Sequence, residues 1–287
     1  METAFAGRDA AFGALRRAQL RAAFERALDL ARERGAEAIC IAGDLYEDQR
    51  AGPDTAAYLR RTLGELAPVR VFLSPGNHDP CAPGSVYRQM EPLPDNIAVF
   101  DERNFRAVKL ADGVTLWGMG QISALDRARA LTGLTCTGDG THLLLFHGSD
   151  ENSIRPGKEM IAPFNDAEVA GAGAAHAMVG HFHGKSRGAH HAYPGSPEPL
   201  NSAQDGEHTA SIVTVDRGRV DVSFEPINRT RYIDDELDVA QFGDSAALLH
   251  AVRAKAESAV TEPGAVFCRI RLIGAAPASL DADLQPL

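Results

Sequence analysis

Two histidines stand one residue apart where an apolar stretch ends. In MVGHFHG, residues 178–184, His181 and His183 flank Phe182. On an extended segment residues i and i+2 point to the same face, so both imidazoles share a side if the strand continues through them. The glycines around them instead indicate that the strand ends here in a loop. A polar turn with two solvated histidines would explain an isolated pair, so the rest of the chain must decide.

Three further apolar stretches end in side chains of the same kinds. Asp44 follows AICIAG, Asn77 and His78 follow VRVFLSPG, and His147 closes THLLLF. Gly, Asn and Asp are also usual in turns, so each cluster alone is weak evidence. Four such strand ends together are hard to explain as turns, because a sheet gathers its strand tips at one edge. Carboxylate, amide and imidazole donors suit a divalent ion such as manganese, iron or zinc.

The elements that would position these residues alternate between helix and strand. Apolar residues at helical spacing predict a helix over 13–34, followed by a strand over 36–44. A second helix is predicted over 53–67 and a second strand over 69–79. From residue 97 shorter alternating segments predict more strands, including a hairpin around DRGR at 216–219. These patterns predict an α/β fold with two stacked mixed β-sheets flanked by helices.

The last part of the chain has its own pattern. Residues 231–274 predict a strand, a helix and a second strand, which we interpret as a small α+β cap. We therefore place a domain boundary near residue 230, between a main domain over 1–230 and a partial C-terminal cap over 231–287.

Composition excludes several classes of protein. The formal net charge of −10 argues against a protein that coats nucleic acid by bulk charge. A local basic strip remains open at GKSRGAHH, residues 184–191, with a solvated loop as the alternative. The four cysteines are scattered, which signals neither a zinc knuckle nor a disulfide framework. No apolar run approaches the roughly 20 residues of a membrane span and no leader pattern is present, so we predict a cytoplasmic location.

With these motifs in place, the sequence resembles the calcineurin-like metallophosphoesterases. The signature of that family is Asp-x-His, Gly-Asp, Gly-Asn-His-Asp/Glu, His and Gly-His-x-His, in that order. The matching pieces, within residues 1 to about 230, are Gly43-Asp44, Gly76-Asn77-His78-Asp79, His147 and Gly180-His181-Phe182-His183. AGDLYED and the segment that begins YPGSPEPL are similar to the SbcD-like DNA repair exonucleases. The resemblance implies hydrolysis of DNA phosphodiester bonds by a two-metal mechanism, with manganese as the expected metal.

The resemblance implies a ligand role for five residues. Asp44 resembles the carboxylate that bridges two ions. Asn77, His147 and His181 resemble the remaining ligands of one ion, whose site is complete. His183, with Asp44, would serve the other ion.

Two more residues are the expected catalytic ones. His78 resembles the group that protonates the leaving sugar oxygen or stabilises its charge. Asp79 would orient His78, although a turn residue explains it equally well. Glu47 and Asp48 either reach such a histidine or shape their loop.

The Asp-x-His piece of the signature is missing from the sequence. It should precede the first helix, where the chain instead begins METAFAGRDAAFG. Either the sequence starts inside a longer protein, or the protein has lost one metal site. We favour the first explanation, because the missing piece would also be a buried strand whose removal leaves backbone groups beside AICIAG unpaired. The C-terminus, SLDADLQPL, also stops earlier than in relatives. Without the Asp and His of the missing piece, the second metal site lacks two ligands. If this chain is the whole polypeptide, we expect weak or no nuclease activity.

The resemblance also implies partners. DNA is the expected substrate, an SbcC-like coiled-coil ATPase the expected partner and a homodimer the expected assembly, with no membrane involved. Two alternatives remain open. One is a metallophosphoesterase that acts on a small nucleotide or another phosphoester, and the other is a non-catalytic scaffold with a decayed metal site.

Overall fold

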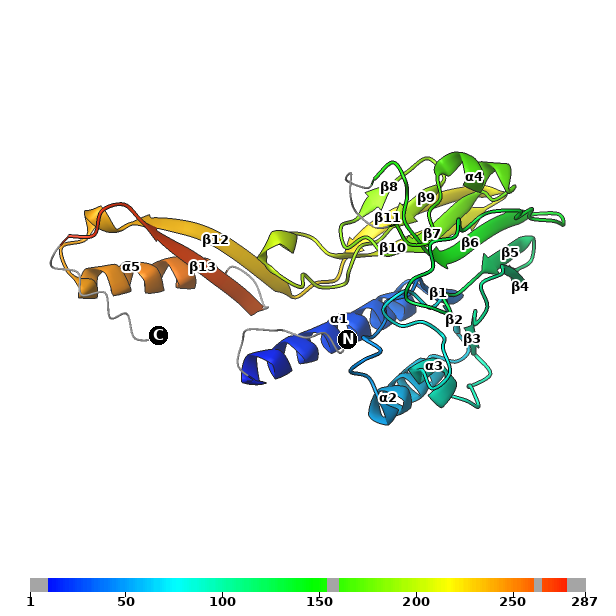
Figure 1. The fold of residues 1–287 in the computed structure, drawn as a ribbon, viewed down its shortest axis with the longest axis horizontal. Coiled ribbons are helices and arrows are strands. Elements are labelled where there is room, and N and C mark those ends of the chain that lie inside the picture. Colours follow the sequence, from blue (N-terminus) through cyan, green and yellow to red (C-terminus); the bar gives the residue numbers. More distant parts are fainter. Residues whose placement is uncertain (1–9, 154–159, 261–264, 278–287) are drawn as a thin grey trace. The chain divides into compact units, whose positions relative to one another are not determined.

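The chain forms two compact units. The computed structural model describes residues 10–153, 160–260 and 265–277 (Figure 1). The first unit contains the described residues up to Pro197 together with His208–Ile227, and the second contains Glu198–Glu207 and the described residues from Asn228 onward. The segments METAFAGRD and SLDADLQPL, on which the expectations about the two ends of the chain rest, lie outside the described residues.

The first unit contains two sheets. The smaller is wholly parallel and has the order β1-β2-β3. The larger is mixed and has the order β4-β5-β6-β7-β9-β8. The strands are β1 (Ala38–Ile41), β2 (Arg70–Leu73), β3 (Ile97–Val99), β4 (Arg106–Ala111), β5 (Val114–Gly118), β6 (Thr141–His147), β7 (His176–Gly180), β8 (Ser186–Arg187) and β9 (His191–Tyr193). The prediction of two sheets is confirmed, except that the smaller one is not mixed.

Helices and one hairpin complete this unit. The helices are α1 (Ala10–Glu33), α2 (Pro53–Gly64), α3 (Val86–Gln89) and α4 (Asp166–Gly171). The hairpin predicted around DRGR is confirmed as β10 (Thr209–Asp216) and β11 (Arg219–Pro226), which pair antiparallel. None of the helices in the described ranges has both the length and the apolarity that a membrane-crossing helix requires.

Strand β2 shows how the sequence produces layers. Successive side chains of a strand point to opposite faces. Val71 and Leu73 accordingly enter a buried cluster with residues of α1, α2 and α3. Phe72 enters another cluster, with Leu143 and Leu145 of the larger sheet. The two sheets therefore stack face to face, and the three helices cover the outer face of the smaller sheet (Figure 1).

Strand β6 is buried along its whole length, which explains the apolar run LLLF at residues 143–146. Leu143 and Leu145 face the smaller sheet, whereas Leu144 and Phe146 join an outer cluster with Val169 of α4. The polar His147 ends this strand and is 1% exposed. A polar group buried this deeply needs hydrogen-bonding or metal partners, so the end of β6 is a candidate functional site.

The second unit is small. It contains β12 (Thr230–Asp238), α5 (Ser245–Ser258), β13 (Ala265–Ile273) and the short 3-10 turns η1 (Ser202–Gln204) and η2 (Val239–Gln241). The predicted order of strand, helix and strand is confirmed, and the two strands pair parallel. Residues 198–207, predicted to lie in the domain over 1–230, belong to this second unit instead. The reason is that Asp205 accepts hydrogen bonds from the main chain of Tyr232 and the side chain of Arg231.

Candidate metal centre

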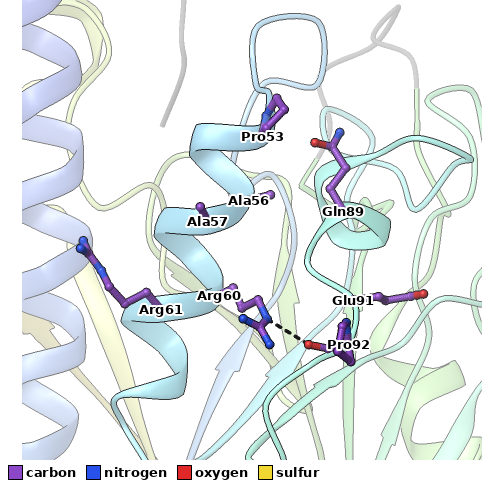
Figure 2. Close-up of a pocket in the computed structure, with 8 residues that line it drawn as sticks. All are labelled: Pro53, Ala56, Ala57, Arg60, Arg61, Gln89, Glu91 and Pro92. Carbon is purple, nitrogen blue, oxygen red and sulfur yellow. Dashed lines mark hydrogen bonds between the residues drawn. The ribbon is translucent and has the colours of Figure 1, made fainter.

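A surface hollow between α2 and the segment after α3 is not the candidate site. It measures about 680 Å³, and Figure 2 shows Gln89 and Pro92 facing α2 across it, with the Arg60 Nε donating to the carbonyl of Pro92 at 2.9 Å. Among the residues that line it, only Glu91 and Gln89 have side-chain oxygens that bind divalent ions, and no histidine accompanies them. The hollow therefore lacks a donor set.

The polar residues that end four strands do converge. Ligand atoms of Asp44, His147 and His181 lie within 4.8 Å of one another. The His147 Nε2 lies 3.4 Å from the Asp44 Oδ2 and 3.0 Å from the Asn77 Oδ1. The His147 and His181 ring centroids are 5.1 Å apart. The four residues expected to ligate one ion thus share one place, and their binding of an ion stays a prediction.

The backbone leaves the strands abruptly at two of these residues. Asp44 has φ of 53° and His181 has φ of 116°, values that residues with a side chain rarely adopt. Such conformations cluster at functional sites, where the surrounding structure holds them. Gly43 and Gly76 provide the necessary space, since a Cβ on either would lie 2.7 or 2.8 Å from the His147 Nδ1. The Gly-Asp and Gly-Asn spacing therefore reflects close packing of the loops around His147.

The orientation of His147 decides what the cluster can hold. Its Nδ1 lies 2.8 Å from the carbonyl oxygen of Ala42, which can only accept a hydrogen bond, so Nδ1 carries the proton and donates it. In the neutral ring Nε2 then presents a lone pair, and it faces the oxygens of Asp44 and Asn77, which are also acceptors. Three electron-rich atoms that face one another are stabilised by a positive charge, supplied either by a bound metal ion or by a proton on Nε2. The donor set therefore fits a divalent metal ion.

Burial keeps the neighbouring imidazole neutral. The pKa of His181 is lowered to about 4, first by burial and then by the electrostatic effect of the neighbouring His147, against an opposing effect of Asp44. His183 and His78 lower the pKa of His181 further, so both rings lie close enough to His181 to affect it electrostatically. Neutral imidazole is the form that binds a metal ion, and His181 is therefore ready to act as a ligand at neutral pH.

His183 lies outside the converging group. It is exposed, and its carbonyl accepts a hydrogen bond from the Ser196 main chain at 2.9 Å. The assignment of His183 and Asp44 to a second ion stays a prediction.

The two expected catalytic residues have different surroundings. The His78 ring is about half exposed, and its Nδ1 lies 3.2 Å from the Glu47 Oε2. Its main-chain N–H donates to the Asp44 Oδ1 at 2.9 Å. The prediction that Asp79 orients His78 is corrected, because the hydrogen bonds of the Asp79 carboxylate go elsewhere. Glu47 is the acidic residue in contact with His78.

Asp79 instead holds the loops that carry the ligands. It is fully buried and accepts from the main-chain N–H groups of Asp44, Leu45 and Gly76 and from the Tyr87 hydroxyl, at 2.6 to 2.9 Å. Burial, and then the charge of Asp44, raises the pKa of Asp79 to about 6. Asp79 thus fixes the backbone at Asp44, where φ is positive.

Two contacts around His147 had no signal in the sequence. Gln121 donates from Nε2 to the His147 carbonyl at 3.0 Å and is 1% exposed. Tyr193 contacts the residues that follow His147, as described below. Gln121 belongs to no motif, whereas Tyr193 begins the segment YPGSPEPL, whose sequence does not indicate this contact. Neither residue stands near His147 in the sequence.

Two stacked sheets that gather carboxylate, amide and imidazole donors at their strand ends define a metal-dependent hydrolytic fold. The family model of the calcineurin-like phosphoesterases matches residues 17–185, a span that includes all of these donors. The chain belongs to the calcineurin-like phosphoesterases. That family carries out metal-dependent hydrolysis of phosphoesters. The comparison with curated proteins finds no match.

Proposed function

We propose that the chain is a phosphodiesterase that hydrolyses DNA in the manner of the SbcD-like exonucleases, with manganese as its metal. The observation that carries the proposal is the arrangement at His147, whose Nε2 faces the oxygens of Asp44 and Asn77 and so fits a metal ion beside them. The proposed ligands of that ion are Asp44, Asn77, His147 and His181. The resemblance to phosphoesterases with two metal ions implies a second ion, and Asp44 and His183 would be ligands of that ion.

Bound divalent ions supply Lewis-acid polarisation of the phosphate and a lower pKa for the attacking water. The residues of the chain provide the rest. His78 stands exposed beside the cluster, where it can donate a proton to the leaving oxygen. Glu47 accepts from the His78 Nδ1, which leaves Nε2 directed away from Glu47 for that task. The His78 main chain also orients the Asp44 carboxylate.

Three features support DNA as the substrate. The segments AGDLYED and YPGSPEPL are similar to the SbcD-like branch. Lys185 and Arg187 are exposed directly after the His183 loop, where they could contact a phosphate backbone. The second unit has the strand, helix and strand of the expected cap. An SbcC-like ATPase as partner and a homodimer remain parts of this proposal.

The experiment combines metal binding with a substrate comparison. Mn²⁺ is titrated calorimetrically into the metal-free 287-residue protein, and hydrolysis of linear double-stranded DNA is compared with that of a 2′,3′-cyclic nucleotide. We expect one well-bound Mn²⁺ per chain and slow cleavage of DNA that exceeds cleavage of the cyclic nucleotide. Failure to bind Mn²⁺ would favour the scaffold and overturn the proposal. Preference for the cyclic nucleotide would overturn DNA as the substrate.

A variant of His78 separates catalysis from metal binding. His78→Ala should reduce phosphodiester hydrolysis by about 100-fold, the usual contribution of a general acid, with Mn²⁺ content unchanged. The metal content is measured on the same preparation. Loss of metal together with activity would show that His78 is a ligand, contrary to its proposed role.

A further inference from the structure

The hydroxyl of Tyr193 closes the turn that follows His147. Tyr193 ends β9 and is fully buried. Its hydroxyl donates to the Gly148 carbonyl at 2.7 Å and accepts from the Asp150 main-chain N–H at 2.9 Å. Gly148 directly follows the candidate ligand His147. One side chain therefore satisfies two backbone groups of the loop that carries this ligand.

The ring of the same tyrosine contacts the other histidine loop. Its centroid lies 4.8 Å from that of Phe182, with the planes inclined by 37°. Phe182 stands between His181 and His183, and its ring is 5.3 Å from the His181 ring. The Phe182 ring thus packs between the rings of Tyr193 and His181.

The position of Tyr193 is itself firmly held. β9 pairs with β7 through Met178 and Ala192, so the strand that carries Tyr193 is joined to the strand that leads to His181. His191, at the start of β9, is 3% exposed and lies with its Nδ1 2.7 Å from the Asp166 Oδ1. The His191 and Tyr193 ring centroids are 5.5 Å apart at nearly right angles.

We infer that Tyr193 is a positioning residue of the metal centre, which fixes the separation of His147 and His181 by contacting both of their loops. The inference rests on the proposed metal binding. The physical reason is the narrow tolerance of a metal site, in which ligands must stay within about 0.5 Å of their working geometry. A hydroxyl that bonds the peptide after His147 fixes the backbone from which that imidazole projects, and the ring on Phe182 does the same for His181.

The decisive variant removes the hydroxyl and keeps the ring. Tyr193→Phe retains the contact with Phe182 but leaves the Gly148 carbonyl and the Asp150 N–H without this partner. The matched control is Tyr58→Phe, which removes a hydroxyl that donates to Glu25 at 2.9 Å from α2, an element that carries none of the donors. Both proteins are prepared free of metal, and Mn²⁺ affinity and the visible spectrum with Co²⁺ are measured.

We expect Tyr193→Phe to bind Mn²⁺ about 10-fold more weakly and to shift the Co²⁺ absorption bands, since partners beyond the ligands typically contribute 10- to 100-fold to affinity. Tyr58→Phe should match the wild type in both. Wild-type affinity and spectrum in Tyr193→Phe, even with a lower melting temperature in chelator, would overturn the inference and leave the proposed function intact. Failure of the wild type to bind either ion would overturn both.

A second variant decides the matter if Tyr193→Phe does not fold. Phe182→Leu lies on a loop and keeps an apolar side chain while it removes the ring that contacts Tyr193. We expect weaker Mn²⁺ binding and an altered Co²⁺ spectrum here too, because the His181 loop loses its packing. An unchanged affinity and spectrum in this variant would overturn the inference.

Discussion

Asp44→Asn is expected to weaken Mn²⁺ binding by at least about 100-fold and to slow phosphodiester hydrolysis by about 1,000-fold. Both effects exceed those of replacing a residue that only supports a metal ligand, which typically weaken binding by about 10- to 100-fold. Asp44 supplies the only carboxylate in the converging group of the described residues. An amide in its place removes the negative charge that attracts the ion. The amide NH₂ can also donate to the His147 Nε2, which lies 3.4 Å from one oxygen of the native carboxylate.

The same substitution should leave the metal-free protein at least as stable as the wild type. The amide oxygen can still accept from the His78 main chain, and the new donor removes an unfavourable meeting of lone pairs. Asp48→Asn is the matched control, because it makes the same change of charge on an exposed residue of the same loop. Calorimetric titration and thermal melts in chelator give both quantities. An Mn²⁺ affinity within about 3-fold of the wild type would show that the ion binds elsewhere.

The sequence predicted where the candidate ligands lie because two simple constraints act on them. A strand such as β6, buried on both faces, has a continuous apolar run over residues 143–146, so the polar His147 that follows it is conspicuous. Parallel strands in the same sheet then bring their carboxyl ends together, as β6 and β7 do. Residue type and strand end are both visible in the sequence, and the convergence of Asp44, His147 and His181 follows from them.

The supporting contacts could not be predicted, because they depend on which backbone groups meet in three dimensions. Gln121 and Tyr193 stand 26 and 45 residues from the main-chain groups that they bond near His147. Asp79 follows His78 in the sequence, which favoured a contact between them, but a turn directs the two side chains apart. Residues 198–207 look like a continuation of the first domain until Asp205 is seen to bond the main chain of Tyr232.

Asp79→Asn is expected to lower the free energy of unfolding by about 2–4 kcal/mol, the cost of leaving a buried donor unsatisfied and losing charge-assisted hydrogen bonds. The native carboxylate accepts four hydrogen bonds with two oxygens. An amide offers one oxygen, and its NH₂ group would face main-chain N–H groups that also donate. Tyr87→Phe is the matched control, since it removes one of the four bonds and should cost only about 1 kcal/mol. Urea denaturation of metal-free protein measures both.

The pH dependence of the difference in unfolding free energy between the wild type and Asp79→Asn tests the protonation of the Asp79 carboxyl group. Because the pKa of Asp79 is raised to about 6 in the folded protein, chiefly by burial, the folded state binds a proton more readily than the unfolded chain. The free energy of unfolding therefore falls as pH rises through this interval, by linkage. Asn does not titrate, so the deficit of Asp79→Asn should be largest near the usual carboxyl pKa of about 4 and should narrow toward pH 7. A deficit that widens toward pH 7 would mean that the hydrogen bonds outweigh burial and lower the pKa of Asp79.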